Sequence, residues 1–407
     1  MSTAGNSAAG PPLGRLVRLM FVLFLAGVAL RMTILAMPPV IPLVHDELRM
    51  SETQVGLLVG LPLAVFALAA VPGSLLIARI GAMLAVLVGM IIAAVASGVR
   101  GAAIDVWTLY ATAIATGFGV AIMQPGMPTL VREWLPTRIA LGTVAYTSGM
   151  LIGATASSTT TIPYILPALH GSWRADMVFW AVPALLIVPV FYLLSPRQDT
   201  HQTAPLTTRG RWWPDWNKPL IWLLGLTLGS NNSTFFGANA FIGDYLASQG
   251  KSQLFGAAVG WLNGMQTAAP LLLLIFADRL ERRAWPFLLF GPLLFAAFVA
   301  IILARSDLAI LVGAGLVGFT TAMTFAPALA LPATLSAPGD VARNSAGMFT
   351  VSYTCGIIIP TISGALWDIT GRPWTAFLPM CLCAVMLTVL GTVVTRLPKP
   401  ADKPAGR

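Results

Sequence analysis

Long apolar stretches recur along this chain of 407 residues, separated by short connections rich in Pro, Gly and charged residues. A helix that crosses a membrane needs about 20 mostly apolar residues, because each residue advances it by roughly 1.5 Å through a hydrocarbon core about 30 Å thick. We therefore predict an all-α integral membrane protein with twelve transmembrane helices. Their boundaries follow charged, Pro and Gly clusters, at residues 17–43, 53–78, 82–99, 105–131, 138–165, 175–194, 219–247, 253–277, 285–304, 308–335, 344–367 and 374–395.

Composition excludes a soluble globule. The chain is 57% hydrophobic and only 10% charged, with a mean hydropathy of +0.81, whereas soluble domains carry about 25% charged residues. A net charge of +9 would suggest a nucleic-acid partner in a soluble protein. Here the basic residues lie in the short connections between apolar stretches, so we expect the lipid bilayer and not nucleic acid as the partner.

The same basic residues predict orientation. With both termini in the cytoplasm, 17 Lys and Arg residues lie on the cytoplasmic side and 6 on the outer side. This excess agrees with the positive-inside rule, and the opposite orientation would violate it. We therefore expect a multi-pass protein with both termini cytoplasmic.

Beyond Arg18 at its start, the stretch 17–43 contains Arg31 as its only charged residue. A guanidinium near the centre of a membrane helix costs roughly 2.5 to 3.5 kcal/mol on insertion scales, so such residues usually face an ionic partner or a water-filled path. One interpretation is a packing charge matched by a carboxylate on a neighbouring helix. The hydrophobic segments show no acidic residue at comparable depth, which favours a substrate-facing Arg31.

The chain contains an internal repeat. Residues 145–152, Ala-Tyr-Thr-Ser-Gly-Met-Leu-Ile, return at 352–359 as Ser-Tyr-Thr-Cys-Gly-Ile-Ile-Ile, and Gly117-Phe118 returns as Gly318-Phe319. This indicates two pseudo-symmetric six-helix halves, residues 1–194 and 219–407, joined by a cytoplasmic linker at 195–218. Duplicated transporters place their site near mid-membrane between the halves.

Candidate substrate-binding residues follow from that arrangement. Polar side chains at mid-depth of the first, fourth, seventh and tenth spans, the repeat-related tyrosines and one aromatic wall residue form the set Arg31, Gln124, Tyr146, Asn231, Asn232, Phe235, Asn239, Thr324 and Tyr353. The arginine offers a planar fork of donors that suits a carboxylate or a similar anion. For each amide, hydrogen bonding between helices is as good an interpretation as ligand contact.

At two connections the residues resemble the signature of the major facilitator superfamily. The second half carries Asp278-Arg279-Leu280-Glu281-Arg282-Arg283, and the first half retains Arg79 and Gly81 with Ala78 at the Asp position. The resemblance implies the twelve-helix fold of that superfamily and a conformational latch formed by Arg79, Asp278, Arg279, Arg282 and Arg283. The alternative is that these charges only set topology.

Longer matches are similar to one branch, the cyanate permease and nitroimidazole transporter family. They are Arg31 followed by Pro39 and Pro42, the run Gly56-Leu57-Leu58-x-x-Leu61-Pro62, and the run from Gly117 to Pro128. The seventh span departs from relatives at 241–244, Phe-Ile-Gly-Asp. The resemblance implies a small anionic or polar solute as the substrate, a bacterial inner membrane as the location and a functional monomer.

Other chemistries lack support in the sequence. The cysteines Cys355, Cys381 and Cys383 lie in apolar stretches and His45, His170 and His201 lie in connections or at helix ends, so no metal set can be assembled. No phosphate-binding Gly-Lys-Ser loop is present, and no catalytic set is evident. We expect no metal, no cofactor and no enzyme activity, and we weigh a receptor or membrane enzyme only as the alternative class.

The sequence thus predicts a secondary active transporter that works by alternating access on a small anionic solute, cyanate-like or a carboxylate. The alternative is efflux of an uncharged or amphiphilic drug such as a nitroimidazole. An inside-negative potential opposes entry of a monovalent anion by about 2.3 kcal/mol per 100 mV. Accumulation would therefore need exchange against an internal anion, or proton uptake through Asp244 at the outer end of the seventh span.

Overall fold

The computed structural model describes residues 13–50, 52–196, 212–276, 283–304 and 306–398. Within these ranges the regular elements are all helical. The long helices are α1 (Leu13–Leu35), α3 (Glu52–Ile80), α4 (Ala82–Arg100), α5 (Val106–Trp134), α6 (Ile139–Thr160), α8 (Trp173–Leu194), α9 (Pro219–Ser248), α10 (Phe255–Phe276), α11 (Trp285–Leu303), α12 (Asp307–Leu335), α13 (Val341–Thr370) and α14 (Leu378–Thr395). Short elements join them: η1 (Pro38–Val40), α2 (Ile41–Leu48), η2 (Thr161–Ile165), α7 (Leu166–Ala168), η4 (Ser252–Leu254), η6 (Pro338–Asp340) and η7 (Pro373–Phe377).

Among the described residues, ten helices are long and apolar enough to cross a membrane by length and composition. The helices α9 and α10 are not in that group. In α9 the reason is visible in the sequence, because its middle carries the run Ser230-Asn231-Asn232-Ser233-Thr234. The count of twelve transmembrane helices therefore remains a prediction for these two.

The first predicted span differs from the structure. The stretch 17–43 is not one helix, because α1 already ends at Leu35 and the chain turns at Pro38 and Pro39 before α2. Proline lacks a backbone N–H and disfavours a helical residue before it, so a Pro-Pro pair interrupts a helix even where the sequence stays apolar. Arg31 consequently lies in the last turns of α1.

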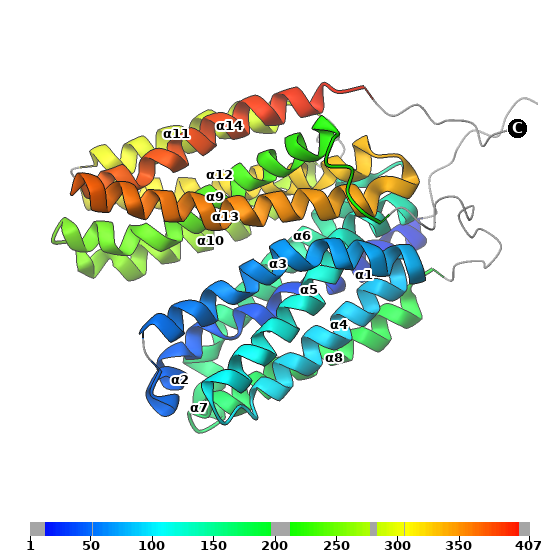
Figure 1. Ribbon diagram of the computed structural model, residues 1–407, viewed down its shortest axis with the longest axis horizontal. Helices are drawn as coiled ribbons and strands as arrows, with labels where there is room; N and C mark the ends of the chain where they lie inside the picture. The colour runs from blue at the N-terminus through cyan, green and yellow to red at the C-terminus, as the bar shows by residue number, and fades with distance from the viewer. Residues whose placement is uncertain (1–12, 51, 197–211, 277–282, 305, 399–407) are drawn as a thin grey trace, which may run out of the picture.

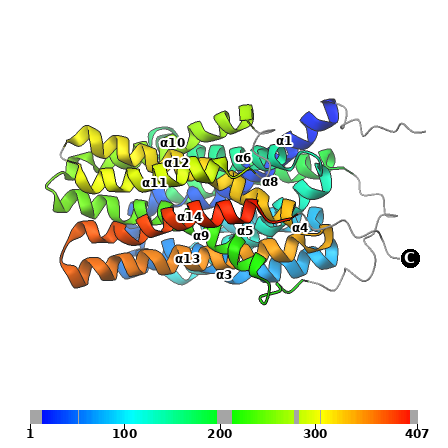
Figure 2. The same ribbon diagram turned by 90° about the horizontal axis from the view of Figure 1, so that it is seen from above.

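The long helices form two groups that run along a common axis (Figures 1 and 2). One group contains α1 to α8 and the other α9 to α14; α13 packs against α3 and α5 of the first group, and α6 packs against α10 and α12 of the second. We call the end that contains Leu13 and Thr395 the linker end, and the opposite end, which contains α2 and α7, the far end. In Figure 1 the groups approach each other most closely toward the linker end.

Small residues bring α1 and α6 into backbone contact. A Cβ added at Gly27 would collide with the carbonyl oxygen of Tyr146, and one added at Gly149 would collide with the carbonyl oxygen of Phe24. Only glycine permits such close approach of two backbones, which is the usual role of small residues between membrane helices. The crossing fixes the helix that carries Arg31 against the helix that carries Tyr146.

Side chains from both groups meet at the linker end. Ala140 and Val144 of α6 share a buried cluster with Ala269 and Leu273 of α10 and with α12 residues. In addition, the hydroxyl of Ser74 in α3 donates to the backbone oxygen of Trp212, which precedes the second group, at 2.9 Å. These contacts hold the two groups together on this side.

At the far end, α2 is fastened to the start of α8. The carboxylate of Glu47 accepts hydrogen bonds from the Trp173 indole and from the Arg174 guanidinium. Arg174 also stacks over the Trp173 ring, 4.4 Å from its centroid, and donates to the Ala103 carbonyl. Hydrogen bonds from Trp173 and then Arg174 hold the pKa of Glu47 below its ordinary value of 4.5.

Candidate functional site

Arg31 lies within electrostatic reach of the other group of helices. It is half-buried, and it interacts electrostatically with the Tyr353 hydroxyl of α13 across the boundary between the groups. Within the described part of the chain, no ion pair or hydrogen bond involves its guanidinium. A permanent cation thus lies at the boundary of the two groups without a counter-ion among the described residues, an arrangement that suits an anionic ligand.

Gln124 of α5 shares Tyr353 with this cation. Its side chain interacts with the Tyr353 hydroxyl, it is 4% exposed, and its Oε1 atom has no hydrogen-bond partner among the described residues. A buried carbonyl oxygen without a donor is costly, so it usually indicates a position that a ligand or water can fill. The glutamine can thus orient Tyr353 while its oxygen stays available.

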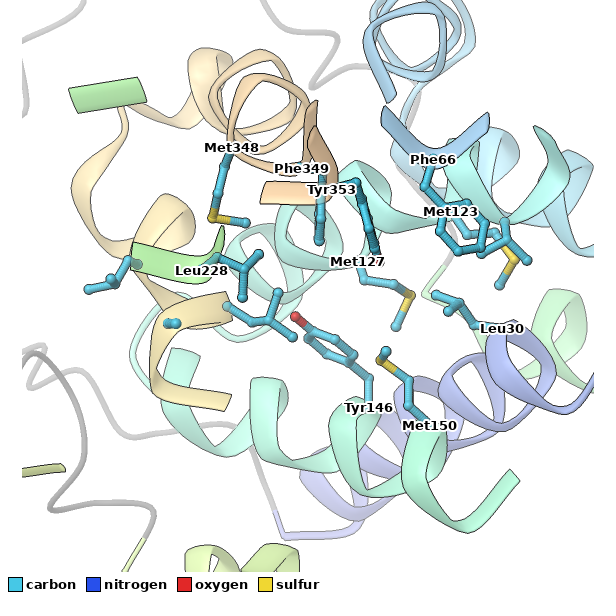
Figure 3. Close-up of a cluster of buried hydrophobic side chains, with 14 of the residues drawn as sticks. Leu30, Phe66, Met123, Met127, Tyr146, Met150, Leu228, Met348, Phe349 and Tyr353 are labelled. Atoms are coloured by element: carbon cyan, nitrogen blue, oxygen red, sulfur yellow. The ribbon is translucent and has the colours of Figure 1, made fainter. Parts of the chain in front are cut away.

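Tyr146 of α6 supplies a second open position. Its side chain is 2% exposed, and its hydroxyl has no partner among the described residues. Figure 3 shows the Tyr146 hydroxyl directed away from Met150 toward the side of the cluster where Leu228 of the second group lies. Tyr146 and Tyr353, which occupy equivalent places in the repeat, belong to the same buried cluster.

We refer to Arg31, Gln124, Tyr146 and Tyr353 as the central site. Its surroundings are apolar and rich in sulfur and aromatic rings (Figure 3). They are formed by Leu30, Phe66, Met123, Met127, Met150, Leu228, Met348 and Phe349. Tyr353 packs against Phe66 of α3 with ring centroids 5.0 Å apart and stacks on Phe349 at 6.1 Å. One cation and a few hydroxyl and amide groups are thus set in an apolar wall, as in many small-molecule sites.

The asparagines of α9 hold helices of the second group together. Asn231 donates to the Thr321 carbonyl and to the Thr324 hydroxyl, at 2.9 and 2.6 Å. Asn232 donates to the Ser352 hydroxyl at 2.8 Å. Of the two interpretations, this geometry favours hydrogen bonding between helices for Asn231, Asn232 and Thr324.

Asn239 and Phe235 lie closer to the far end of α9. Asn239 is half-buried; it donates to the Phe235 carbonyl and accepts a 3.0 Å hydrogen bond from Asn263 of α10. Phe235 is also half-buried and packs against Phe236. Phe235 packs against the buried cluster that contains Tyr146 and Tyr353, whereas the hydrogen bonds given for the Asn239 side chain go to Phe235 and Asn263.

The predicted latch is only partly described. Asp278, Arg279 and Arg282 lie outside the described residues. Arg79 at the end of α3 and Arg283 before α11 are both exposed. Asp244, the predicted coupling residue, is exposed near the far end of α9.

Sequence reasoning missed two features of the first group. Phe66 contacts Tyr353 directly, although its position within an apolar run gave no signal for this. Asp176 is a fully buried carboxylate about one helical turn before Trp180, whose indole hydrogen-bonds to it, although Asp176 lies in the first turn of a predicted span. Among the described residues, no group of three His, Cys, Asp or Glu side chains could hold a metal ion.

Comparison with known proteins now decides the family. The family model described as Major Facilitator Superfamily matches residues 19–259, which is more than half of the chain. The chain belongs to the major facilitator superfamily. This major facilitator protein is an all-α, multi-pass membrane transporter that binds a small molecule, and it is not an enzyme.

Two relatives of this major facilitator transporter come from Escherichia coli strain K12. The cyanate transport protein CynX is 24% identical over 390 residues, covering 94% of this chain and 98% of the relative. The 2-nitroimidazole transporter is 23% identical over 410 residues, covering 97% and 98%. Among solved structures, the Escherichia coli fucose:proton symporter FucP has the same fold, with a TM-score of 0.74, 11% identity and coverage of 94% and 98%. The resemblance to the superfamily and to this branch is confirmed.

Proposed function

We propose that this transporter moves a small anionic solute, cyanate-like or a short carboxylate, across the inner membrane of a bacterium by alternating access. The observation that carries the proposal is the half-buried Arg31 without a counter-ion in the described part of the chain. The solute would accept hydrogen bonds from the guanidinium fork and from the Tyr146 hydroxyl. The relative that transports cyanate supports this class of solute.

Alternating access requires a site that both halves share. Arg31, Gln124 and Tyr146 belong to the first group of helices and Tyr353 to the second, and Arg31 and Tyr353 interact across the boundary. When the two groups rock against each other, the partners of the solute separate, so binding and conformation are linked. This supports a boundary near residues 195–218 between two halves and is compatible with a functional monomer.

The apolar wall favours a second candidate, efflux of an uncharged or amphiphilic compound such as a nitroimidazole. Methionine side chains adapt to varied ligand shapes, and aromatic rings stack on flat heterocycles. Met123, Met127, Met150 and Phe66 provide both kinds of surface. The relative that transports 2-nitroimidazole supports the same reading, but this candidate leaves the charge of Arg31 without a role.

Uptake into proteoliposomes tests the proposal. Purified protein would be reconstituted and offered labelled cyanate, formate, acetate and 2-nitroimidazole in separate experiments. We expect saturable uptake of at least one anion and its loss in Arg31→Gln, while Arg372→Gln, which alters an exposed arginine at the far end, transports as the wild type does. Transport of 2-nitroimidazole alone, unchanged by Arg31→Gln, would reject the anion and support the second candidate.

Orientation is part of the proposal. Both termini would face the cytoplasm, because the linker end then carries most of the Lys and Arg residues. The test uses single cysteines in a background without native cysteines, one at Arg372 on the far end and one at Arg283 on the linker side. In intact cells, a membrane-impermeant thiol reagent should label the cysteine at position 372 and not the one at position 283. The reverse pattern would invert the orientation.

A further inference from the structure

Asp176 is a carboxylate that the central site does not use. It lies in the first turn of α8 and is fully buried. Its Oδ2 atom has no hydrogen-bond partner among the described residues. Burying an ionised carboxylate without a cation or several donors is very costly, so a group in this situation takes up a proton instead.

No cation neutralises Asp176 in the described part of the chain. The helix α8, which carries Asp176, packs against α4 and α1. Toward the far end, the charged residue of α4 is Arg100 and that of α1 is Arg31. Arg100 donates to Thr116 and Thr112 of α5, and Arg31 faces Tyr353. On α8 itself, Arg174 is engaged with Glu47 of α2 and with the Ala103 carbonyl.

The geometry around Thr161 favours the protonated form. Its hydroxyl lies 2.7 Å from the Ser157 carbonyl, to which it can only donate, and 2.9 Å from the Trp180 indole N–H, from which it can only accept. A hydroxyl has one hydrogen and two lone pairs. Oδ1 of Asp176 lies farther from the hydroxyl, at 3.4 Å. Since the single hydrogen is directed at the nearer Ser157 carbonyl, a lone pair of the hydroxyl is left toward the carboxyl group. A protonated carboxyl can donate to that lone pair, whereas an ionised one would be repelled by it.

The threonine stands at an unusual turn of the backbone. Thr161 opens η2, a π-helical turn over Thr161–Ile165 that interrupts the path from α6 to α7. Single π turns break the regular hydrogen-bond ladder and often occur where function needs them. The helix α6 carries Tyr146, crosses α1 at the paired glycines and contacts α10 and α12 of the other group. The far end of α6 is therefore attached to α8 through Thr161, Trp180 and Asp176.

We propose that Asp176 is a proton-binding site that links the conformation of α6 to pH. With the proton bound, Asp176 donates to Thr161, which accepts from Trp180, and the three side chains hold η2 against α8. When α6 rearranges, water reaches the carboxyl group and the proton leaves to solvent. A ligand that binds one conformation more tightly shifts the equilibrium toward it, and a proton obeys the same rule. Acid should therefore favour the conformation described here.

The test compares wild type with Asp176→Asn in the purified full chain without added solute. Asparagine cannot ionise, but its N–H can donate to the Thr161 oxygen as the protonated acid does. We expect the thermal stability of the wild type to decrease as the pH rises from acid to mildly alkaline. The reason is that the unfolded chain loses the Asp176 proton at a lower pH than the folded protein does. In Asp176→Asn this alkaline loss should be absent. Asp105→Asn, at an exposed helix cap on the same end of the molecule, should retain it.

Infrared spectroscopy keeps the inference falsifiable if Asp176→Asn does not fold. At mildly acidic pH the wild type should show the C=O stretch of a protonated carboxyl group shielded from solvent, and Thr161→Val should move that band because the group loses its acceptor. Identical pH profiles for wild type and Asp176→Asn, or a wild type without such a band at mildly acidic pH, would overturn the proposal. Since no solute takes part, these results are independent of the proposed transport function.

Discussion

The Tyr146 hydroxyl gives a prediction in which stability and binding change in opposite directions. The group is buried and has no partner among the described residues, so the folded protein bears its desolvation cost without a compensating hydrogen bond. A buried unsatisfied polar group costs about 1 to 3 kcal/mol. Tyr146→Phe removes only that oxygen and keeps the ring in the packed cluster, and the variant without ligand should be more stable by about 1 kcal/mol or more.

Ligand binding should weaken in the same variant. If the hydroxyl donates to an anionic solute, the lost hydrogen bond is worth about 1.5 to 3 kcal/mol, which is an affinity roughly 10 to 150 times lower. A residue that serves only packing would change stability and binding in the same direction or leave binding unchanged. The opposite signs are therefore diagnostic of a group reserved for a ligand.

Tyr245→Phe is the matched control. The Tyr245 hydroxyl in α9 is also in a buried side chain, but it donates to the carbonyls of Ile301 and Ile302 at 3.3 and 3.2 Å. Its removal leaves those oxygens without this donor and should destabilise the protein by about 1 kcal/mol, with no effect on ligand affinity.

Thermal unfolding of purified protein, with and without cyanate, formate or acetate, measures both quantities. The expected pattern is a higher melting temperature without ligand and a smaller ligand-induced shift for Tyr146→Phe, and the reverse order of stability for Tyr245→Phe. If Tyr146→Phe is destabilised as much as Tyr245→Phe and retains the full ligand shift, the reasoning about the open hydroxyl is wrong.

Two further predictions concern packing and pH. Gly149→Ala should destabilise the protein by about 1 to 3 kcal/mol, because its methyl group would collide with a backbone carbonyl of α1. The control Gly264→Ala, where nothing lies within 4 Å, should be neutral or stabilising. Equal effects of the two variants in thermal unfolding would contradict the close crossing of α1 and α6. The Glu47 carboxylate, whose pKa is lowered by Trp173 and Arg174, contributes stability that is present above its ordinary pKa of 4.5 and lost as the pH falls below it. Glu47→Gln should reduce this loss of thermal stability at acid pH. If the loss is as large in the variant as in the wild type, the contact of Glu47 with Trp173 and Arg174 does not contribute to stability.

Helix positions could be predicted because hydropathy and punctuation are properties of local sequence. The predicted span 219–247 and the helix Pro219–Ser248 nearly coincide, since Lys218 and Pro219 mark the start. The first span could not be delimited in this way. Its residues remain apolar beyond Leu35, and only the backbone geometry of Pro38 and Pro39 ends the helix.

The candidate site was predictable where one residue or one repeat carried the signal. Arg31 stands out by charge, and the offset between Tyr146 and Tyr353 places them in equivalent helices. The partners of Asn231 could not be read from the sequence, because the Thr321 carbonyl and the Thr324 hydroxyl approach it only through tertiary packing. The burial of Asp176 escaped for the same reason, since it depends on how α6 and α8 meet.

The most direct test of the central claim is the affinity of Arg31→Gln for small anions. Titration of purified protein with cyanate, formate and acetate, read as thermal stabilisation, would compare wild type, Arg31→Gln and Arg372→Gln. Loss of two charge-assisted hydrogen bonds should weaken anion binding by about 100-fold or more in Arg31→Gln, while Arg372→Gln retains wild-type affinity. If Arg31→Gln binds the same anion as tightly as the wild type, Arg31 does not hold the solute and the proposed function is wrong.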